Sequence, residues 1–397
     1  MRAILIKGGS AYDALGLFID ELAAAFAAAG HEPIDVDASA GRGPDFYPSL
    51  ERHAAAGPIG LVFTFNIFGD VRDAAGRFIG DIVQAPHVVQ FVDYPPSHLD
   101  RLDAMSPNVA LLCVDPSHVE TILATYGPDR FAHVGFSPHG AVGATVSPGP
   151  DPEAFAAARP IPILFSGTFQ EPDAARWAQM PDNVQRLYEA AVEIALAAEW
   201  VPALAALDAA MVSFGLDPTD KAFAGFRKTT TYVHEYVRAH RRLEVLNTAR
   251  TLGIPLHVVG RGYEGRLDAY PNVTYAGAVD FAAGLDLMAR SRVVLNVNAN
   301  FGAGSHERPL SAMNAGAAAA SDHSEFYAAN FAPGEAMALY RWRDLEAGLA
   351  AVAALAGDAD AAFAMAQAGQ RRVVAEHRWI NRIEPIIAAT EAARRRS

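Results

Sequence analysis

Short apolar runs alternate with longer amphipathic segments through the first part of the chain. The segment 14–30 has apolar residues spaced near the helical period and ends at Gly30, which predicts a helix. The short runs predict strands at 2–7, 33–38, 59–66, 87–96, 110–115 and 132–140. Strands that alternate with helices are typical of α/β proteins with a doubly wound parallel sheet. We therefore expect an N-terminal α/β domain over residues 1–145.

The same alternation restarts after a Gly- and Pro-rich stretch at 141–162, which we interpret as an interdomain linker. Residues 173–252 have a helical pattern that breaks at 215–220. Around this helical segment we expect strands at 163–169, 255–262, 272–277, 293–300 and 316–322, with a helix at 281–289. These elements predict a second α/β domain over residues 160–375. Residues 376–397 predict a C-terminal helix that crosses back and packs on the first domain.

The segment from Gly304 to Ala317, GSHERPLSAMNAGA, predicts an anion site at the end of a strand. It places His306, Glu307 and Arg308 around the start of a short helix. Pro309 suits the first turn of that helix, and Gly316 suits the position after its end. The free N–H groups of a helix start favour a phosphate, and open sheets bind ligands at the carboxyl ends of their strands.

The composition narrows the class of protein. A chain of 397 residues is long enough for two domains, and its 51% hydrophobic and 19% charged residues are typical of a globular fold. The net charge of -13 argues against a general nucleic-acid binder. Cys113 is the only cysteine and lies in an apolar run, so we expect a buried thiol and no disulfide. The opening run, MRAILIKGGS, is too short for a signal peptide or a membrane span, so we expect a cytoplasmic protein without an integral membrane segment.

Several motifs of the second half together resemble a known family. They are the strand ending in SGTF, the strand VVGRG, and the segment VLNVNANFGAGSHERPLSAMNAGAAAASD. With two Rossmann-like halves, they resemble GT-B glycosyltransferases, most closely the CgeB-like spore-maturation group. The resemblance implies an enzyme that moves a sugar from a nucleotide-diphosphate sugar to an acceptor hydroxyl. The acceptor, a glycan, a small molecule or a protein, is left open, and no cofactor is expected.

By this resemblance Arg308 stands where the family has an arginine beside the donor diphosphate, and a guanidinium fork suits phosphate oxygens. The alternative is a surface arginine near a helix start. Glu307 is expected either to bind ribose hydroxyls or to cap the helix, and His306 either to bond a phosphate or sugar hydroxyl or to pack against the loop.

Other donor-side residues come from neighbouring strand ends and from the helical segment. Each has a plain structural alternative, which is a strand-ending turn or a solvated side chain. For the phosphates we expect Ser166, Gly167, Thr168 and Lys228, and for the nucleotide base Gly260, Arg261 and Gly262.

The sequence also departs from the family. Many retaining enzymes of this fold carry two glutamates eight residues apart, and Ser311 and Ala303 stand at those positions here. Retaining and inverting chemistry both stay open. The alternatives to a transferase are a nucleotide-sugar-binding or interaction protein without catalysis, and a nucleotide-sugar epimerase. A Rossmann dehydrogenase is disfavoured, because GGSAYDALG after the first strand is not G-x-G-x-x-G.

Candidate catalytic bases lie at strand ends in the first domain. Asp93, His118 and His139 are the catalytic candidates, with Asp115 as a further acid, and each is alternatively a turn former. Asn66 and Gly69 are expected on the acceptor side.

We expect no protein-bound metal. The Asp-x-Asp strings at 35–37 and 358–360 lie outside the expected site, and the histidines show no metal-ligand spacing.

Overall fold

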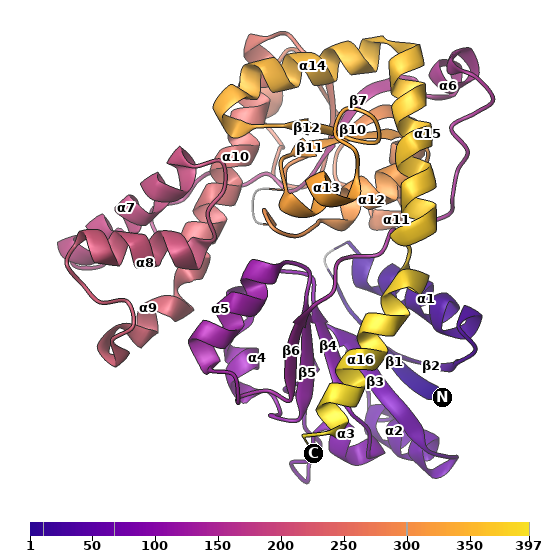
Figure 1. The fold of residues 1–397 in the computed structure, drawn as a ribbon, viewed down its shortest axis with the longest axis vertical. Helices are drawn as coiled ribbons and strands as arrows, with labels where there is room; N and C mark the ends of the chain where they lie inside the picture. Colours follow the sequence, from indigo (N-terminus) through magenta and orange to yellow (C-terminus); the bar gives the residue numbers. More distant parts are fainter. Residues whose placement is uncertain (11, 67, 299–300, 397) are drawn as a thin grey trace. The chain divides into compact units, whose positions relative to one another are not determined.

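The computed structural model describes residues 1–10, 12–66, 68–298 and 301–396. The chain divides into two compact units (Figure 1). Unit 1 comprises Met1–Val142 and His377–Ser397, and unit 2 comprises Gly143–Glu376.

Unit 1 contains a six-stranded parallel sheet in the order β2-β1-β3-β4-β5-β6. All residues of β3, β4 and β5 are buried, as expected for strands covered by helices on both faces. Its elements are β1 (Arg2–Gly8), α1 (Ala14–Ala28), β2 (Glu32–Ala38), α2 (Phe46–Ala55), β3 (Ile59–Phe65), α3 (Ile79–Val83), β4 (His87–Phe91), η1 (Pro95–His98), α4 (Leu99–Ala104), β5 (Val109–Cys113), α5 (Pro116–Tyr126) and β6 (His133–Phe136).

The C-terminal segment returns to unit 1. Its short turn η5 (Trp379–Arg382) packs on α1, and α16 (Ile383–Arg394) packs on β4, β5 and β6. Trp379 is 1% exposed and contacts Phe18 and Phe65. The side chain of Arg382 donates to the carbonyl of His139. These contacts explain why the last helix belongs to the core of unit 1.

Unit 2 contains a second six-stranded parallel sheet, in the order β12-β11-β10-β7-β8-β9. Helices α10, α14 and α15 lie over one hydrophobic cluster, and α11 and α12 over another. The elements of the sheet and its covering helices are α6 (Pro152–Ala158), β7 (Ile161–Ser166), β8 (Leu256–Val259), η3 (Leu267–Ala269), β9 (Val273–Tyr275), α11 (Phe281–Ala289), β10 (Ser291–Asn296), α12 (Glu307–Asn314), β11 (Ala318–Asp322), α13 (Glu325–Asn330), β12 (Ala338–Tyr340), η4 (Trp342–Asp344), α14 (Leu345–Gly357) and α15 (Ala359–Glu376).

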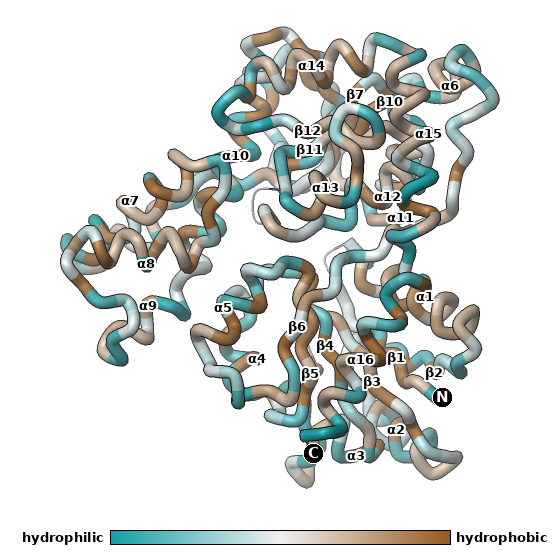
Figure 2. Tube along the Cα trace, in the orientation of Figure 1, coloured by the Kyte–Doolittle hydropathy of each residue, from teal (hydrophilic) through white to brown (hydrophobic). Residues whose placement is uncertain are grey.

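A helical projection is inserted between β7 and β8 of unit 2. It has its own hydrophobic core, in which Trp177, Tyr188 and Val233 are buried. The projection contains α7 (Asp182–Ala197), α8 (Ala203–Ser213), η2 (Lys221–Phe223), α9 (Ala224–Lys228) and α10 (Thr230–Thr251). Figure 2 shows hydrophobic stretches along the strands of the sheets, whereas many connecting loops are hydrophilic.

The predicted fold class, two α/β sheet units with a helical insertion and a returning C-terminal helix, is confirmed. Several boundaries differ. The helical segment predicted from residue 173 begins as a helix only at Asp182, because residues 175–179 form turns and Pro181 is the N-cap of α7. The strand predicted at 293–300 is β10, which ends at Asn296, and Ala299 and Asn300 lie outside the described residues. The short strand β12 was not predicted.

Among the described residues, no single helix is long and apolar enough to cross a membrane. One pair of helical segments, Trp342–Gly357 and Ala359–Glu376, meets the length and composition criteria together but is bent by 99°.

Candidate functional site

The carboxyl ends of neighbouring strands in unit 2 lie side by side. Leu295 on β10 is aligned with Phe165 on β7, one residue before both strands end, and Asn296 is aligned with Ser321 of β11. The chain leaves β7 for β8 on one side and returns to β10 on the other, so the strand order reverses between β7 and β10. Open α/β sheets bind ligands outside the carboxyl ends of their strands at such a reversal.

Helix α12 begins at this edge. Its N-cap is His306, whose Nδ1 accepts a hydrogen bond from the backbone N–H of Arg308 at 3.3 Å. At its other end Gly316 has φ +76°, and an added Cβ would lie 2.4 Å from the carbonyl oxygen of Val146. Gly316 is therefore required both for the turn that ends α12 and for its close packing on the chain at Val146. Since α12 is short, packing at its end also limits where its start can lie.

Arg308 is 9% exposed and points back to the end of β10. Its Nη1 donates a 2.7 Å hydrogen bond to Oδ1 of Asn296. Within the described residues it forms no ion pair with a carboxylate. A buried guanidinium normally needs an anionic partner, so this position suits an anionic ligand.

Glu307 and His306 contact each other at the helix start, where Nδ1 of His306 faces Oε2 of Glu307. Their side chains are 10% and 19% exposed. Burial lowers the pKa of His306, the Glu307 carboxylate opposes this shift, and Arg308 and Arg242 add to it. Tyr327 contacts the residue that caps α12, since its hydroxyl accepts a hydrogen bond from the backbone N–H of His306 at 2.9 Å.

The loop after β7 lies beside a cation that the sequence analysis did not select. Nη1 of Arg242, on α10, donates to the carbonyl of Thr168 at 3.1 Å. A Cβ added to Gly167 would lie 3.7 Å from the guanidinium carbon of Arg242. The charge of Arg242 also contributes to the lowered pKa of His306, the residue that caps α12. Ser166, Gly167 and Thr168 are thus brought to the same edge as Arg308.

The strand-end glycines after β8 have a clear backbone role. A Cβ on Gly260 would lie 1.9 Å from the carbonyl oxygen of Gly167, and one on Gly262 would lie 2.6 Å from that of Phe169. The carbonyl of Arg261 accepts from the backbone N–H of Phe169 at 2.8 Å. The Gly260–Gly262 turn therefore supports the loop after β7 directly, and Arg261 itself is exposed.

Lys228 is not brought to this edge. It ends α9, which packs on η2 and α10 within the helical projection. Figure 1 shows α9 at the tip of the projection, away from α12.

A buried polar network lies behind the site. Nδ2 of Asn296 donates to Oγ of Ser321 at 3.0 Å, and Asp322 accepts from Ser321, from the indole N–H of Trp342 and from the backbone of Asn298. Burial raises the pKa of Asp322 to about 6, which these hydrogen bonds partly oppose. This network fixes Asn296, the residue that positions Arg308.

Two predicted residues of unit 1 meet at the carboxyl ends of β3 and β4. Nδ2 of Asn66 donates to Oδ2 of Asp93 at 2.7 Å, and Oδ1 of Asn66 accepts from the backbone of Val92 at 2.8 Å. Nε2 of His98 lies 3.6 Å from Oδ2 of Asp93. The side chain of Asp93 is 60% exposed, so solvent and ligands reach it.

The two predicted catalytic histidines lie in the interior of unit 1. His118 is 1% exposed beside the ring of Tyr94, and His139 is 2% exposed beside the ring of Phe18. Burial of this degree favours a packing role for both. Gly69 is also tightly packed, since an added Cβ would lie 2.8 Å from Cγ of Met105.

In the part of the chain that the structure describes, no group of three or more His, Cys, Asp or Glu side chains is placed to hold a metal ion. Cys113 is buried, as expected from its apolar neighbours, and burial raises its pKa.

Comparison with known proteins supports the assignment of the fold. Residues 238–388 match the model of a family described as "Glycosyl transferase-like". No curated protein sequence matches the chain significantly.

Several solved structures are similar over nearly the whole chain. Sucrose-phosphate synthase from Thermosynechococcus elongatus is 15% identical, with a TM-score of 0.54 over 100% of this chain and 98% of the other. An alpha-glucosyltransferase (AGT) in complex with UDP is 9% identical, with a TM-score of 0.55 over 98% and 100%. HepE of Anabaena, in complex with UDP and glucose, is 10% identical, with a TM-score of 0.52 over 99% and 100%. The chain has the GT-B fold of these glycosyltransferases.

Arg242 and His98 are the main site residues that the sequence analysis missed. The basic pair of Arg241 and Arg242 was visible within the helical segment, but nothing in its spacing showed which arginine faces the sheet. The structure divides their roles, because Arg241 is buried against the carbonyls of Leu196 and Ala198.

Proposed function

We propose that this chain is a Leloir-type glycosyltransferase, similar to the CgeB-like group, that moves a sugar from a nucleotide-diphosphate sugar to an acceptor hydroxyl without a resident metal or cofactor. One observation carries the proposal. Arg308 is buried at the start of α12, beside the reversal of strand order, and its one hydrogen-bonded side-chain partner in the described residues is the neutral Asn296. A diphosphate would supply the missing negative charge.

The donor would lie across the edge between β7 and β10. We assign its diphosphate to Arg308, to Arg242 and to the loop Ser166–Thr168, where backbone and hydroxyl donors adjoin a cation. In glycosyl transfer these groups would stabilise the charge that develops on the leaving diphosphate.

The ribose and the sugar need hydrogen-bond acceptors rather than cations. Glu307 is the acid at the helix start, and its side chain is 10% exposed. We assign Glu307 to donor hydroxyls and His306 to capping α12, where its Nδ1 accepts from the backbone N–H of Arg308. The Gly260–Gly262 turn would border the nucleotide base.

Two structural relatives support uridine diphosphate as the first nucleotide to test. HepE is described in complex with UDP and glucose, and AGT in complex with UDP. Both share the fold of this chain at low sequence identity.

On the acceptor side, Asp93 is the best base. It is exposed, it is oriented by Asn66, and it has His98 within 3.6 Å. An inverting reaction needs such a base within reach of the acceptor hydroxyl.

Calorimetric titration tests the donor assignment. We expect UDP, GDP or dTDP to bind with a dissociation constant in the micromolar to millimolar range typical of substrates. Absence of binding by all three nucleotides would contradict the proposal.

A second candidate is a protein that binds a nucleotide-sugar without transferring it. Two residues favour this candidate. Ser311 is fully buried and, by the resemblance, stands where many retaining relatives carry a glutamate, and Ala303 stands at the other glutamate position. Hydrolysis of any bound donor above the uncatalysed rate would exclude this candidate. A nucleotide-sugar epimerase would instead interconvert two donors without an acceptor.

A further inference from the structure

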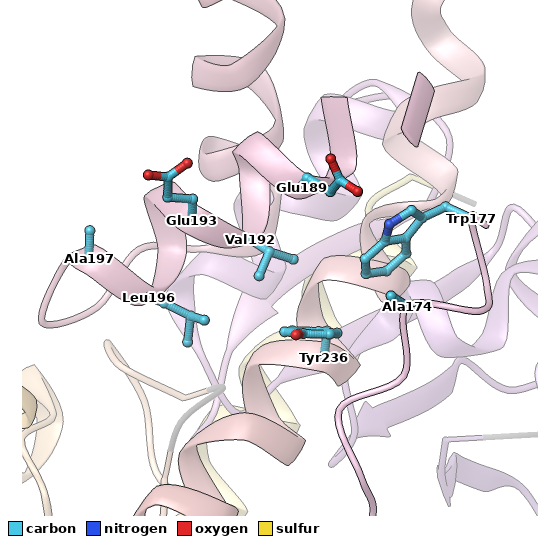
Figure 3. Close-up of a pocket in the computed structure, with 8 residues that line it drawn as sticks. All are labelled: Ala174, Trp177, Glu189, Val192, Glu193, Leu196, Ala197 and Tyr236. Carbon is cyan, nitrogen blue, oxygen red and sulfur yellow. The ribbon is translucent and has the colours of Figure 1, made fainter. Parts of the chain in front are cut away.

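The helical projection of unit 2 contains a pocket that the proposed donor site does not use. It has a volume of about 590 Å³, within the range of small-molecule sites. Three separate segments build it: Ala174 and Trp177 before α7, the α7 face that includes Val192 and Leu196, and Tyr236 of α10 (Figure 3). Its floor is therefore largely apolar and aromatic.

Two acidic side chains stand on the wall of this pocket. Glu189 and Glu193 lie one helical turn apart on α7, and Figure 3 shows both above the apolar floor. Both residues are exposed, and neither carboxylate has a hydrogen bond or an ion pair within the described residues. Two unpaired carboxylates beside an apolar floor favour a ligand that is both cationic and apolar.

A third polar group is independent of these acids. Trp177 is only 2% exposed, held by stacking on Tyr188 at 5.6 Å and by contact with Tyr236 at 5.7 Å. No residue in the described part of the chain accepts a hydrogen bond from its indole N–H. In Figure 3 the indole nitrogen lies on the side of the ring toward Glu189. This N–H is not sealed from solvent, so a ligand that occupies the pocket can supply its acceptor in place of water.

We propose that this pocket binds a small hydroxylated organic amine with an apolar body. The ammonium group would pair with Glu189 and Glu193, the apolar body would cover Val192, Leu196 and Tyr236, and the hydroxyl oxygen would accept from the indole N–H of Trp177. This site is separate from the donor site, and the inference does not depend on the proposed function.

The test uses the full-length protein and two probes of nearly equal shape. The first is 2-amino-1-phenylethanol, which carries an ammonium group, a hydroxyl and an apolar ring. The second is 1-phenyl-1,2-ethanediol, in which a neutral hydroxyl replaces the ammonium group. Each is titrated while the indole N–H signals of the four tryptophans are followed by nuclear magnetic resonance. The Trp177→Phe variant identifies the signal of Trp177.

We expect the amine to shift the Trp177 signal and the diol to bind more weakly by up to about fivefold for each ion pair lost, because an exposed ion pair contributes up to about 1 kcal/mol. The double variant Glu189→Gln, Glu193→Gln is expected to weaken amine binding by a similar factor or more. The matched control, Glu120→Gln with Glu391→Gln, removes two exposed carboxylates from unit 1 and should leave amine binding unchanged.

Three results would overturn the inference. They are no shift of the Trp177 signal at millimolar amine, equal binding of amine and diol, and unchanged amine binding by the Glu189→Gln, Glu193→Gln variant. Thermal unfolding of each variant checks that unit 2 is intact, so a misfolded variant is recognised whether or not the chain binds UDP. An amine that fails to bind while UDP binds would refute this inference and leave the proposed function standing.

Discussion

Replacing Arg308 by alanine is expected to weaken UDP binding by about 10- to 150-fold. A hydrogen bond between charged groups contributes about 1.5–3 kcal/mol, and each 1.4 kcal/mol corresponds to a factor of about ten in the dissociation constant. The upper part of this range is favoured, because Arg308 is 9% exposed and solvent screens its charge little.

The same substitution should also destabilise the fold, because Oδ1 of Asn296 loses its 2.7 Å donor. An unsatisfied buried acceptor costs about 1–3 kcal/mol, which corresponds to a melting temperature lower by roughly 2–4 °C per kcal/mol in a unit of this size. Calorimetry at fixed ionic strength therefore has to be paired with thermal unfolding. Arg308→Lys keeps the charge but loses the guanidinium fork, and should bind UDP with intermediate affinity.

Arg290→Ala is the matched control. Arg290 is exposed directly before β10, at the opposite edge of the same sheet, and its loss should leave UDP affinity unchanged. If folded Arg308→Ala protein binds UDP within about twofold of the unaltered chain, the placement of the diphosphate beside α12 is refuted.

Three other outcomes are expected. Arg242→Ala should weaken UDP binding about five- to tenfold, less than the loss of Arg308 because Arg242 is only partly buried, and calorimetry measures this directly. Gly260→Ala should lower the melting temperature and abolish UDP binding, because its Cβ would lie 1.9 Å from the carbonyl oxygen of Gly167, and thermal unfolding with and without UDP checks both effects. Unit 1 should lose stability as the pH falls below 6.5. Burial lowers the pKa of His87 from 6.5 to about 3, so below pH 6.5 the unfolded chain binds a proton at His87 and the folded chain does not. The loss should be about 2 kcal/mol between pH 7 and pH 5, and His87→Gln should remove this component in urea unfolding at the two pH values.

The strand ends of unit 2 were predictable because their chemistry is local. An apolar run followed by Ser-Gly-Thr, or by His-Glu-Arg before a small-residue helix, identifies both the strand and the polar groups at its end. Parallel strands place those ends on one edge, so Ser166 and Arg308 were expected together although they are far apart in sequence.

Other site residues depend on tertiary packing that the sequence pattern does not encode. Arg242 reaches Thr168 from the middle of the long helix α10, and the direction of its side chain follows from how that helix packs on the sheet. His98 approaches Asp93 because the short turn η1 follows β4, which the periodicity did not resolve.

The sequence did not show the direction of the side chains of two histidines that we selected as candidate bases. His118 and His139 follow strands, as catalytic residues often do, but their rings pack against Tyr94 and Phe18 inside unit 1. A strand end specifies where a residue lies in the fold and leaves open whether its side chain points to solvent or to the core.

Transfer from a nucleotide-sugar is measured by the nucleoside diphosphate that it releases. The purified chain is incubated with UDP-, GDP- and dTDP-sugars, and the released nucleotide is measured against Arg308→Ala and an enzyme-free control. We expect release above the uncatalysed rate with at least one donor, and a marked loss of that release in Arg308→Ala. Tight donor binding without release from any of these donors, in the presence of a broad panel of hydroxyl acceptors, would contradict it.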